Sequence, residues 1–411
     1  MNRYDVTVTK PKTVAHNNNG VYLIRDSINP LLKLENCYGM FRFRILNGQV
    51  TNASIWMKMY GTFLTCLFVA YYSYHYIMHT EDEEINTLKG VDKVIEIMDQ
   101  IPIIVMLLQH VISLISFYRI GGKNIQFVRL LEQIDCSLKI SRNKHFYIKT
   151  RTHLQISLSL FFVIYVGSAI YDFIIEDHIV LSKLMEIVVD LERHLESLSF
   201  FIFIKILVDR LKVLNDYLDN FIKVKLERSV NLNFRQDDPF DKEFNFIGSV
   251  NNKNNKIRTL TIAYDNIGEA CRLTNEMFDI QIFLTLVSTF INIIIAIWTT
   301  IWSFRSHKEF KFNTLLECAL EFFAFGVICY ICDDLNHERN LTRTFVNKLV
   351  IDYDLPMTMR FQAKTLLELM RVQKFQISSY DMYTLNNKLM VSFLGILTTY
   401  VIFILQISHF L

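Results

Sequence analysis

Charged residues are scarce in this sequence. Asp, Glu, Lys and Arg make up 20% of the 411 residues, whereas soluble domains carry about 25%. Hydrophobic residues account for 51%, and the mean hydropathy is +0.24. The formal net charge of +2 is too small to indicate a nucleic-acid partner. The composition therefore favours a membrane protein that binds no nucleic acid.

Glycine is also scarce, with only 12 residues, and the phosphate-binding and nucleophile patterns GxxxxGK[ST], GxGxxG and GxSxG are absent. Cys329 and Cys332 form a single CxxC without the second ligand pair that a zinc site needs. His337-Glu338 lacks the second histidine of a zinc-protease motif. We therefore expect neither an enzyme nor a bound metal or cofactor.

The apolar residues are instead gathered into seven blocks, each long enough for a helix to cross about 30 Å of hydrocarbon. These blocks predict an all-α polytopic fold with seven transmembrane helices at residues 55–77, 94–118, 154–175, 179–208, 278–304, 314–332 and 388–411. The fourth block is the weakest, because Lys183, Glu186, Asp190, Glu192 and Arg193 fall in its first half. That half must face protein or a water-filled cavity rather than lipid.

The distribution of Lys and Arg predicts the orientation. The N-terminal segment and the three long loops carry 34 of these residues, whereas the three short loops carry 6. The N-terminus is therefore expected in the cytoplasm and, after seven crossings, the C-terminus outside the cell. This orientation is opposite to that of G-protein-coupled receptors. The N-terminus also lacks the apolar core of a cleaved signal peptide.

The long loops contain helical patterns of their own. Residues 209–277 begin as a continuation of the fourth span, and residues 229–256 are rich in Asn, Asp and Lys, which predicts a mobile linker. Pro356 separates two further helices. We expect a cytoplasmic segment at residues 1–54, spans 1–4 at residues 55–208 and a cytoplasmic loop at residues 209–277. Spans 5–6 follow at residues 278–332, cytoplasmic anchor helices at residues 333–387 and the seventh span at residues 388–411.

The last span ends the printed sequence with TTYVIFILQISHFL. On a helix of 3.6 residues per turn, Thr399, Phe403, Gln406 and Phe410 share one stripe. Gln406 in hydrocarbon would leave its amide unsatisfied, which costs several kcal/mol. The amide must therefore meet water or protein, and a hydrogen bond inside one subunit and a shared pore axis are both open readings.

Residues 399–406 resemble the signature of the insect gustatory receptor family, which has Thr-Tyr, five apolar residues and Gln-Phe. The preceding stretch from Phe375 resembles that family's lead-in to its last span, and the close match ends at Ile407, which stands where the motif has Phe. The arrangement of seven spans with an inward N-terminus and short outer loops is similar over the whole chain.

The resemblance implies a ligand-gated, non-selective cation channel, built as a tetramer with the last span around a central pore. It places Thr399, Phe403, Gln406 and Ile407 at the pore and gate, and subunit contacts in residues 366–375 and 380–387. The implied partners are a small-molecule tastant, permeating monovalent and divalent cations, membrane lipid and either identical subunits or other gustatory receptors. The implied location is the plasma membrane of sensory neurons.

A tastant would bind between the outer halves of spans two to six. The polar and aromatic residues expected there are Tyr165, Ser168, Tyr171, Asp172, Glu186, Asp190, Trp298, Trp302, Glu317, Glu321 and Phe322. Carboxylates and aromatic rings suit a cationic, alkaloid-like bitter compound. The same residue types also suit a sugar, the Trp residues are typical interface anchors, and Glu317 or Glu321 could pair with Lys183, Arg193 or Lys308.

The sequence leaves two classes of function open. The first is a cation channel opened by an external tastant. The second is a seven-span receptor that signals through a partner without conducting. A transporter is disfavoured, because the sequence shows no inverted repeat and no pair of spans broken by Gly or Pro.

Overall fold

The computed structural model describes residues 18–46, 49–80, 91–175, 181–230, 246–305 and 312–410. Within these ranges the chain is predominantly helical and has two short hairpins. The helices are α1 (Asn18–Cys37), α2 (Ile55–Thr80), α4 (Val91–Ser137), α5 (Lys144–Ile175), α6 (Leu181–Val230), α8 (Lys256–Arg305), α9 (Phe312–Ile351), α10 (Met357–Val372) and α11 (Asn387–Phe410), with a 3-10 turn at Ile140–Arg142. The hairpins pair β1 (Arg44–Leu46) with β2 (Gln49–Thr51) and β3 (Ser378–Ser379) with β4 (Tyr383–Thr384), both antiparallel.

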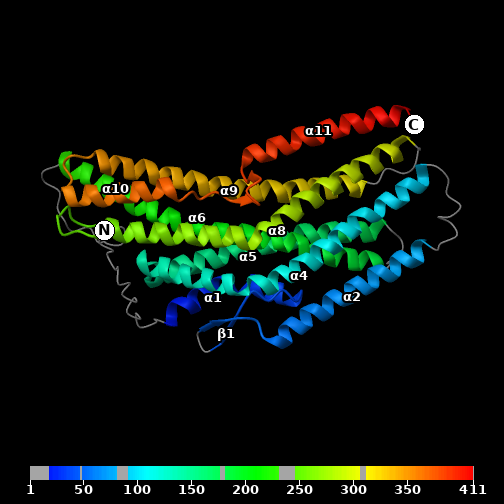
Figure 1. The fold of residues 1–411 in the computed structure, drawn as a ribbon, viewed down its shortest axis with the longest axis horizontal. Coiled ribbons are helices and arrows are strands. Elements are labelled where there is room, and N and C mark those ends of the chain that lie inside the picture. Colours follow the sequence, from blue (N-terminus) through cyan, green and yellow to red (C-terminus); the bar gives the residue numbers. More distant parts are fainter. Residues whose placement is uncertain are drawn as a thin grey trace, which may run out of the picture.

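Each of the seven predicted spans falls on one long helix, namely α2, α4, α5, α6, α8, α9 and α11. Several of these helices continue well past the length that a bilayer requires; α6 and α8 have 50 residues each. Figure 1 shows the helices as one elongated bundle, with α10 at its left end and the far end of α11 at its right. In the right half of this view, α2 and α11 lie along opposite edges of the bundle, α2 below and α11 above.

Length and composition alone identify three segments able to cross a membrane in the described ranges: Gln100–Ser137, Lys256–Ile301 and Asn387–Gln406. The charged first half of the fourth predicted span lies in α6, where Glu192 and Arg193 are buried inside the bundle. The expectation that this half faces protein is confirmed for these two side chains. Their charges meet protein partners instead of lipid, which makes a charged helix tolerable in a membrane bundle.

The helix extensions near α10 form the largest apolar core. It is built around fully buried side chains of α4, α6, α8, α9 and α10, among them Leu131, Leu214, Leu260, Val346 and Leu366. Leu211, Leu214, Leu218 and Phe221 recur at helical spacing along α6 and form one apolar stripe that faces this core. α10 also turns Leu366, Met370 and the following Phe375 inward, so much of the segment 366–375 packs within its own subunit.

An ion pair crosses this core between α4 and α6. Arg210 Nε and Nη2 each donate to Asp135 at 2.8 Å, and Tyr147 Oη donates to Asp135 Oδ2 at 2.6 Å. All three side chains are buried. Burial, with the Asp135 carboxylate adding to it, raises the pKa of the Tyr147 phenol. The phenol therefore keeps its proton and remains a hydrogen-bond donor at physiological pH.

Tyr147→Phe is expected to destabilise the receptor by about 1.5–3 kcal/mol, the range for a hydrogen bond to a charged group. The ring keeps its packing, whereas Asp135 loses one of its three donors. The loss would be measured by thermal unfolding of the purified receptor. The matched control is Tyr353→Phe, an 81%-exposed tyrosine in the loop after α9, and equal unfolding midpoints for the two variants would contradict the prediction.

The first hairpin and α1 were not predicted, because residues 1–54 were assigned only as a cytoplasmic segment, without secondary structure. Gly39, after α1, adopts a φ of 78°, and a Cβ at this position would lie 2.6 Å from the Cα of Gly61 on α2. Only glycine allows this backbone-to-backbone approach. The approach fixes the start of α2 against α1, where Tyr60 Oη also donates to the Cys37 carbonyl at 3.0 Å.

The predicted linker at residues 229–256 is only partly described. Residues 231–245 lie outside the described residues, while α6 continues to Val230 and α8 begins at Lys256. At the described end of the linker, Phe246 is buried and stacks on Tyr217 with ring centroids 4.7 Å apart. This end is therefore packed against the helices. The helix break at Pro356 is confirmed, because α9 ends at Ile351 and α10 begins at Met357.

Candidate functional site

Arg193 on α6 is the centre of a buried polar cluster. Its Nη1 donates to Glu321 Oε2 of α9 at 2.9 Å, its Nη2 also contacts Glu321 Oε1, and Nη2 donates to Asp190 Oδ1 at 2.5 Å. Thr289 of α8 donates to Glu321 Oε2 at 2.9 Å. The cluster thus joins α6, α8 and α9 through charge-assisted hydrogen bonds, which are the strong class.

Tyr165 and His194 complete this cluster on the α5 side. Tyr165 Oη donates to Asp190, and its ring meets the His194 ring edge-on at 5.8 Å. His194 Nε2 lies 3.2 Å from Arg193 Nη2. The two Nη2 hydrogens already reach Asp190 and Glu321, and His194 Nε2 also lies 3.5 Å from Asp190 Oδ2. The carboxylates of Asp190 and Glu321 thus face the one guanidinium of Arg193, with the His194 ring beside them.

The oxygen and nitrogen atoms of Asp190, His194 and Glu321 come within 4.8 Å of one another, as the ligands of a metal ion would. Arg193 already supplies a positive charge between the two carboxylates. A metal ion at this position would have to displace the guanidinium. The arrangement is therefore that of an internal ion pair, with Arg193 in the place of a bound cation.

A second polar set runs along another face of α6. Glu192 contacts His110 Nδ1, and Glu196 Oε2 accepts from Ser113 at 2.9 Å, which ties α6 to α4. Thr65 on α2 donates its one hydroxyl proton to the Gly61 carbonyl at 3.0 Å. It must therefore accept from His110 Nε2, also at 3.0 Å.

A third link joins α4 to α8. Gln109 Nε2 donates to Thr285 Oγ1 at 3.1 Å, and Ser288 Oγ donates to Gln109 Oε1 at 3.1 Å. All three side chains are buried. The polar groups of α2, α4, α5, α6, α8 and α9 thus meet inside one part of the bundle. Such buried polar groups are stable in a membrane only when they are paired or reach water.

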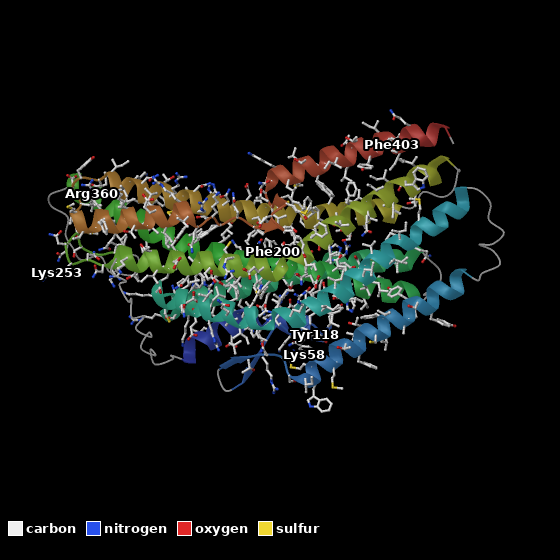
Figure 2. The ribbon with its side chains drawn as sticks, viewed as in Figure 1. Lys58, Tyr118, Phe200, Lys253, Arg360 and Phe403 are labelled. Carbon is white, nitrogen blue, oxygen red and sulfur yellow. The ribbon has the colours of Figure 1, made fainter. Side chains whose placement is uncertain are left out.

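The terminal helix α11 packs on α8 and α9 along one side only. Tyr400 meets Phe290 of α8 edge-on at 5.4 Å, and Phe393 lies 4.9 Å from Phe325 of α9 between ring centroids. On the other side Phe403 is 57% exposed, and Thr399 and Gln406 are exposed as well. Figure 2 places Phe403 on α11 at the edge of the bundle, in contrast to Phe200 in its interior.

The predicted stripe of α11 is thus left uncovered by the rest of the chain where it is described. The hydroxyls of Thr398 and Thr399 donate back to the carbonyls of Leu394 and Gly395, at 2.8 and 2.9 Å. These bonds satisfy both hydroxyls within the helix. The Gln406 side chain is not buried against another helix of the same subunit.

An apolar groove of about 420 Å³ lies between α11 and the helices α8 and α9. Its lining includes Phe322, which was expected at the ligand site, together with Cys318, Thr398, Val401 and Ile402. Phe322 therefore faces the groove beside α11, whereas its neighbour Glu321 faces Arg193. The structure consequently does not bring these two candidate residues into one pocket.

The structure brings Tyr165, Asp190 and Glu321 together around Arg193, which confirms the alternative that Glu321 pairs with this arginine. Trp298 lies on α8 and is partly buried. Other candidates belong to described helices, but their side chains lie outside the described part: Ser168, Tyr171, Asp172, Glu186, Trp302, Glu317 and the pore candidate Ile407.

Several members of the buried network were not singled out from the sequence as site residues. Glu192 was treated only as a charge that weakens a span, and Arg193 as such a charge and as a possible partner of Glu317 or Glu321. His110, Gln109 and Glu196 were not considered. One signal was available. Glu192, Glu196 and Ser199 follow the spacing i, i+4, i+7, which puts three polar side chains on one stripe of this helix.

The structure defines a helical, multi-pass membrane protein with an internal polar network and an uncovered terminal helix. The family profile described as 7tm chemosensory receptor matches residues 28–409. The chain therefore belongs to the 7tm chemosensory receptor family, and it is a membrane receptor rather than an enzyme.

Two solved structures have the same fold. The insect olfactory receptor OR5 from Machilis hrabei in complex with eugenol has a TM-score of 0.64 and 12% sequence identity, and the match covers 94% of this chain and 99% of that one. The structure described without eugenol also gives a TM-score of 0.64, with 13% identity and the same coverage. A search of curated proteins finds no match.

Proposed function

We propose that this receptor is a gustatory receptor that acts as a ligand-gated, non-selective cation channel. The single observation that supports the proposal most is the exposed stripe of α11, with Phe403 and Gln406 on a face that the subunit itself leaves uncovered. In a tetramer, four such helices would surround a central axis. An apolar ring can gate by dewetting, and a ring of amides can solvate a passing cation without trapping it.

The proposed topology has the helix extensions and α10 in the cytoplasm and the C-terminus of α11 outside. The excess of Lys and Arg in the long loops supports this orientation. The helix extensions also support this orientation, because they enclose a large apolar core. A bundle with an apolar interior and charged side chains on its outside is stable in water rather than in lipid. Exposed apolar side chains at Tyr353, Met357, Phe361 and Val372 would then cover one another or a neighbouring subunit in the assembly.

The proposed ligand is a small organic cation, such as a bitter alkaloid. In the Arg193 cluster, two carboxylates face one guanidinium, so a positive ligand would meet uncompensated negative charge. Asp190 is the more accessible of the two carboxylates, with 26% of its side chain exposed, compared with 8% for Glu321. The rings of Tyr165 and Phe161, stacked at 5.8 Å, offer aromatic contact beside it.

We expect quinine to evoke a cation current in cells that express the receptor, and Asp190→Asn to raise its half-maximal concentration at least tenfold. The substitution removes the accessible charge and keeps the hydrogen-bonding shape of the side chain. Calcium entry and whole-cell current would measure the response. The matched control is Glu368→Gln, which alters an exposed ion pair with Arg371 on α10. A response confined to sugars such as sucrose would contradict the cationic ligand.

A second candidate function is a seven-span receptor that signals through a partner without conducting. The paired, buried charges of α6 and α9 suit either function, because a two-state receptor also needs polar contacts that can rearrange. The functions separate in a cell without G-protein signalling: the channel still conducts when ligand is added, whereas the signalling receptor gives no current. A sugar-gated channel of the same family remains the alternative for the ligand.

A further inference from the structure

The hairpin that leads into α11 is held against α8 by two hydrogen bonds from its backbone amides to side-chain oxygens of α8. The amide of Ser378 donates to Asn275 Oδ1 at 2.9 Å, and the amide of Tyr380 donates to Asp279 Oδ1 at 2.6 Å. Ser379 Oγ also donates to the Asp279 carbonyl at 3.3 Å. Asn275 and Asp279 are one helical turn apart, so both acceptors face the hairpin from the same side of α8.

The tip of this hairpin has an unfavourable backbone conformation. Tyr380 and Asp381 are consecutive residues with φ of 48° and 54°, a region that side chains other than those of Gly, Asn and Asp seldom adopt. A bulky residue keeps such a conformation only when its surroundings impose it. The Asp279 bond and the edge-on contact of the Tyr380 and Phe283 rings, at 5.7 Å, are the constraints from α8.

A second attachment holds the first turn of α11. Asn387 Nδ2 donates to Asp333 Oδ2 of α9 at 2.7 Å, and Asn386 Oδ1 accepts from the amide of Leu389 at 2.9 Å. The pore helix therefore begins at a point tied to both α8 and α9. A Cβ at Gly395, farther along α11, would meet only open space, so this position adds no further attachment.

The same two helices carry partners of the Arg193 cluster. Thr289 lies ten residues after Asp279 on α8, which is about 15 Å along a helix, and Glu321 lies twelve residues before Asp333 on α9, about 18 Å. Thr289 and Glu321 are hydrogen-bonded to each other at 2.9 Å. A rigid helix segment thus connects each end of the polar cluster with one attachment of the pore helix.

We propose that Asp279, supported by Asn275 and Asp333, is a positioning residue that couples α8 and α9 to the pore helix. A displacement of either helix at the Arg193 cluster would move the start of α11 through these bonds. This role rests on the proposed channel function. It concerns residues that touch neither the ligand nor the pore axis, and whose effect would pass only through the hairpin.

The test compares Asp279→Leu, which removes the acceptor, with Asp279→Asn, which keeps an oxygen for the Tyr380 amide. In the purified full-length receptor, Asp279→Leu should speed hydrogen exchange of the segment around Tyr380 at least tenfold, and Asp279→Asn should restore slow exchange. In cells, Asp279→Leu should lower the maximal current evoked by quinine or sucrose at least tenfold, with surface level unchanged. Thermal stabilisation of the receptor by the same probe should be retained, because binding is not affected.

Glu269→Leu is the control for a lost carboxylate on α8, since Glu269 pairs with Arg272 of its own helix. Unchanged exchange in Asp279→Leu would overturn the attachment itself. Faster exchange with a normal maximal current, or an equal loss of current in Glu269→Leu, would overturn the coupling role. Absence of current from the unsubstituted receptor with both probes would overturn the proposed function and the coupling role together, while the exchange result would still decide whether Asp279 holds the hairpin.

Discussion

Replacement of Arg193 by methionine is expected to destabilise the receptor by about 3–5 kcal/mol, the cost of leaving a buried charge without its partner. Methionine keeps much of the volume and removes the guanidinium, so Asp190 and Glu321 face each other uncompensated. The loss would appear as a lower midpoint of thermal unfolding and a lower level at the cell surface. It is the largest stability effect that we expect from a single substitution in the described bundle.

A second substitution distinguishes lost charge pairing from lost packing. Glu321→Gln in the Arg193→Met background removes one of the two unpaired carboxylates and should recover part of the stability, whereas Glu321→Gln alone should be destabilising. Arg371→Met serves as the control, because its partner Glu368 is exposed and such surface pairs contribute about 0–1 kcal/mol. If the double variant were less stable than Arg193→Met alone, the proposed role of the ion pair would be wrong.

Phe403→Ala is expected to raise the current in the absence of ligand roughly tenfold, because a tenfold change in an open–closed ratio requires only about 1.4 kcal/mol. Four large apolar side chains would be removed from the proposed constriction at once, which lets water enter. Gln406→Leu should instead lower the conductance of each open channel, since it replaces the amides that face the ions with apolar groups.

Ile402→Ala is the matched control for these pore variants. Ile402 is next to Phe403 and also half exposed, but it lines the groove toward α8 and α9 rather than the predicted stripe. Its truncation should leave both the basal current and the single-channel conductance close to those of the unsubstituted receptor. Single-channel recordings that show the same change for Ile402→Ala as for Phe403→Ala would argue against a pore on the proposed face.

The sequence was sufficient to predict the helices that cross the membrane. A helix in lipid must satisfy its own backbone, so a long apolar block can hardly be anything else, and each of the seven predicted blocks lies on one helix. The continuation of α6 and the break at Pro356 were also predictable, because the stripe from Leu211 to Phe221 and the missing proline amide are local features.

Contacts between distant segments were not predictable in the same way. Arg193 and Glu321 are 128 positions apart, and Tyr380 and Asp279 are 101 apart, so no local periodicity relates them. The pairing of Arg193 with Glu321 depends on how α6 and α9 pack. The two short hairpins were missed because their strands have only 3 residues each in the first hairpin and 2 in the second, too few to show an alternating pattern.

The separation of Glu321 from Phe322 follows from helix geometry. Adjacent residues on a helix point about 100° apart, so one faced the polar cluster of α6 and the other the groove beside α11. Sequence composition places both near the same depth of the membrane but does not tell which neighbour each will meet. The proposed ligand site is therefore narrower than the sequence suggested, with Asp190 and Tyr165 as its accessible members.

In the proposed channel, α11 helices from four copies of this chain enclose a water-filled path. A density map of the assembled receptor in lipid would show whether they do. We expect four α11 helices around one axis, with Gln406 turned toward solvent on that axis. A map in which the Gln406 amide is enclosed within a single subunit, away from any continuous solvent, would rule out the proposed pore.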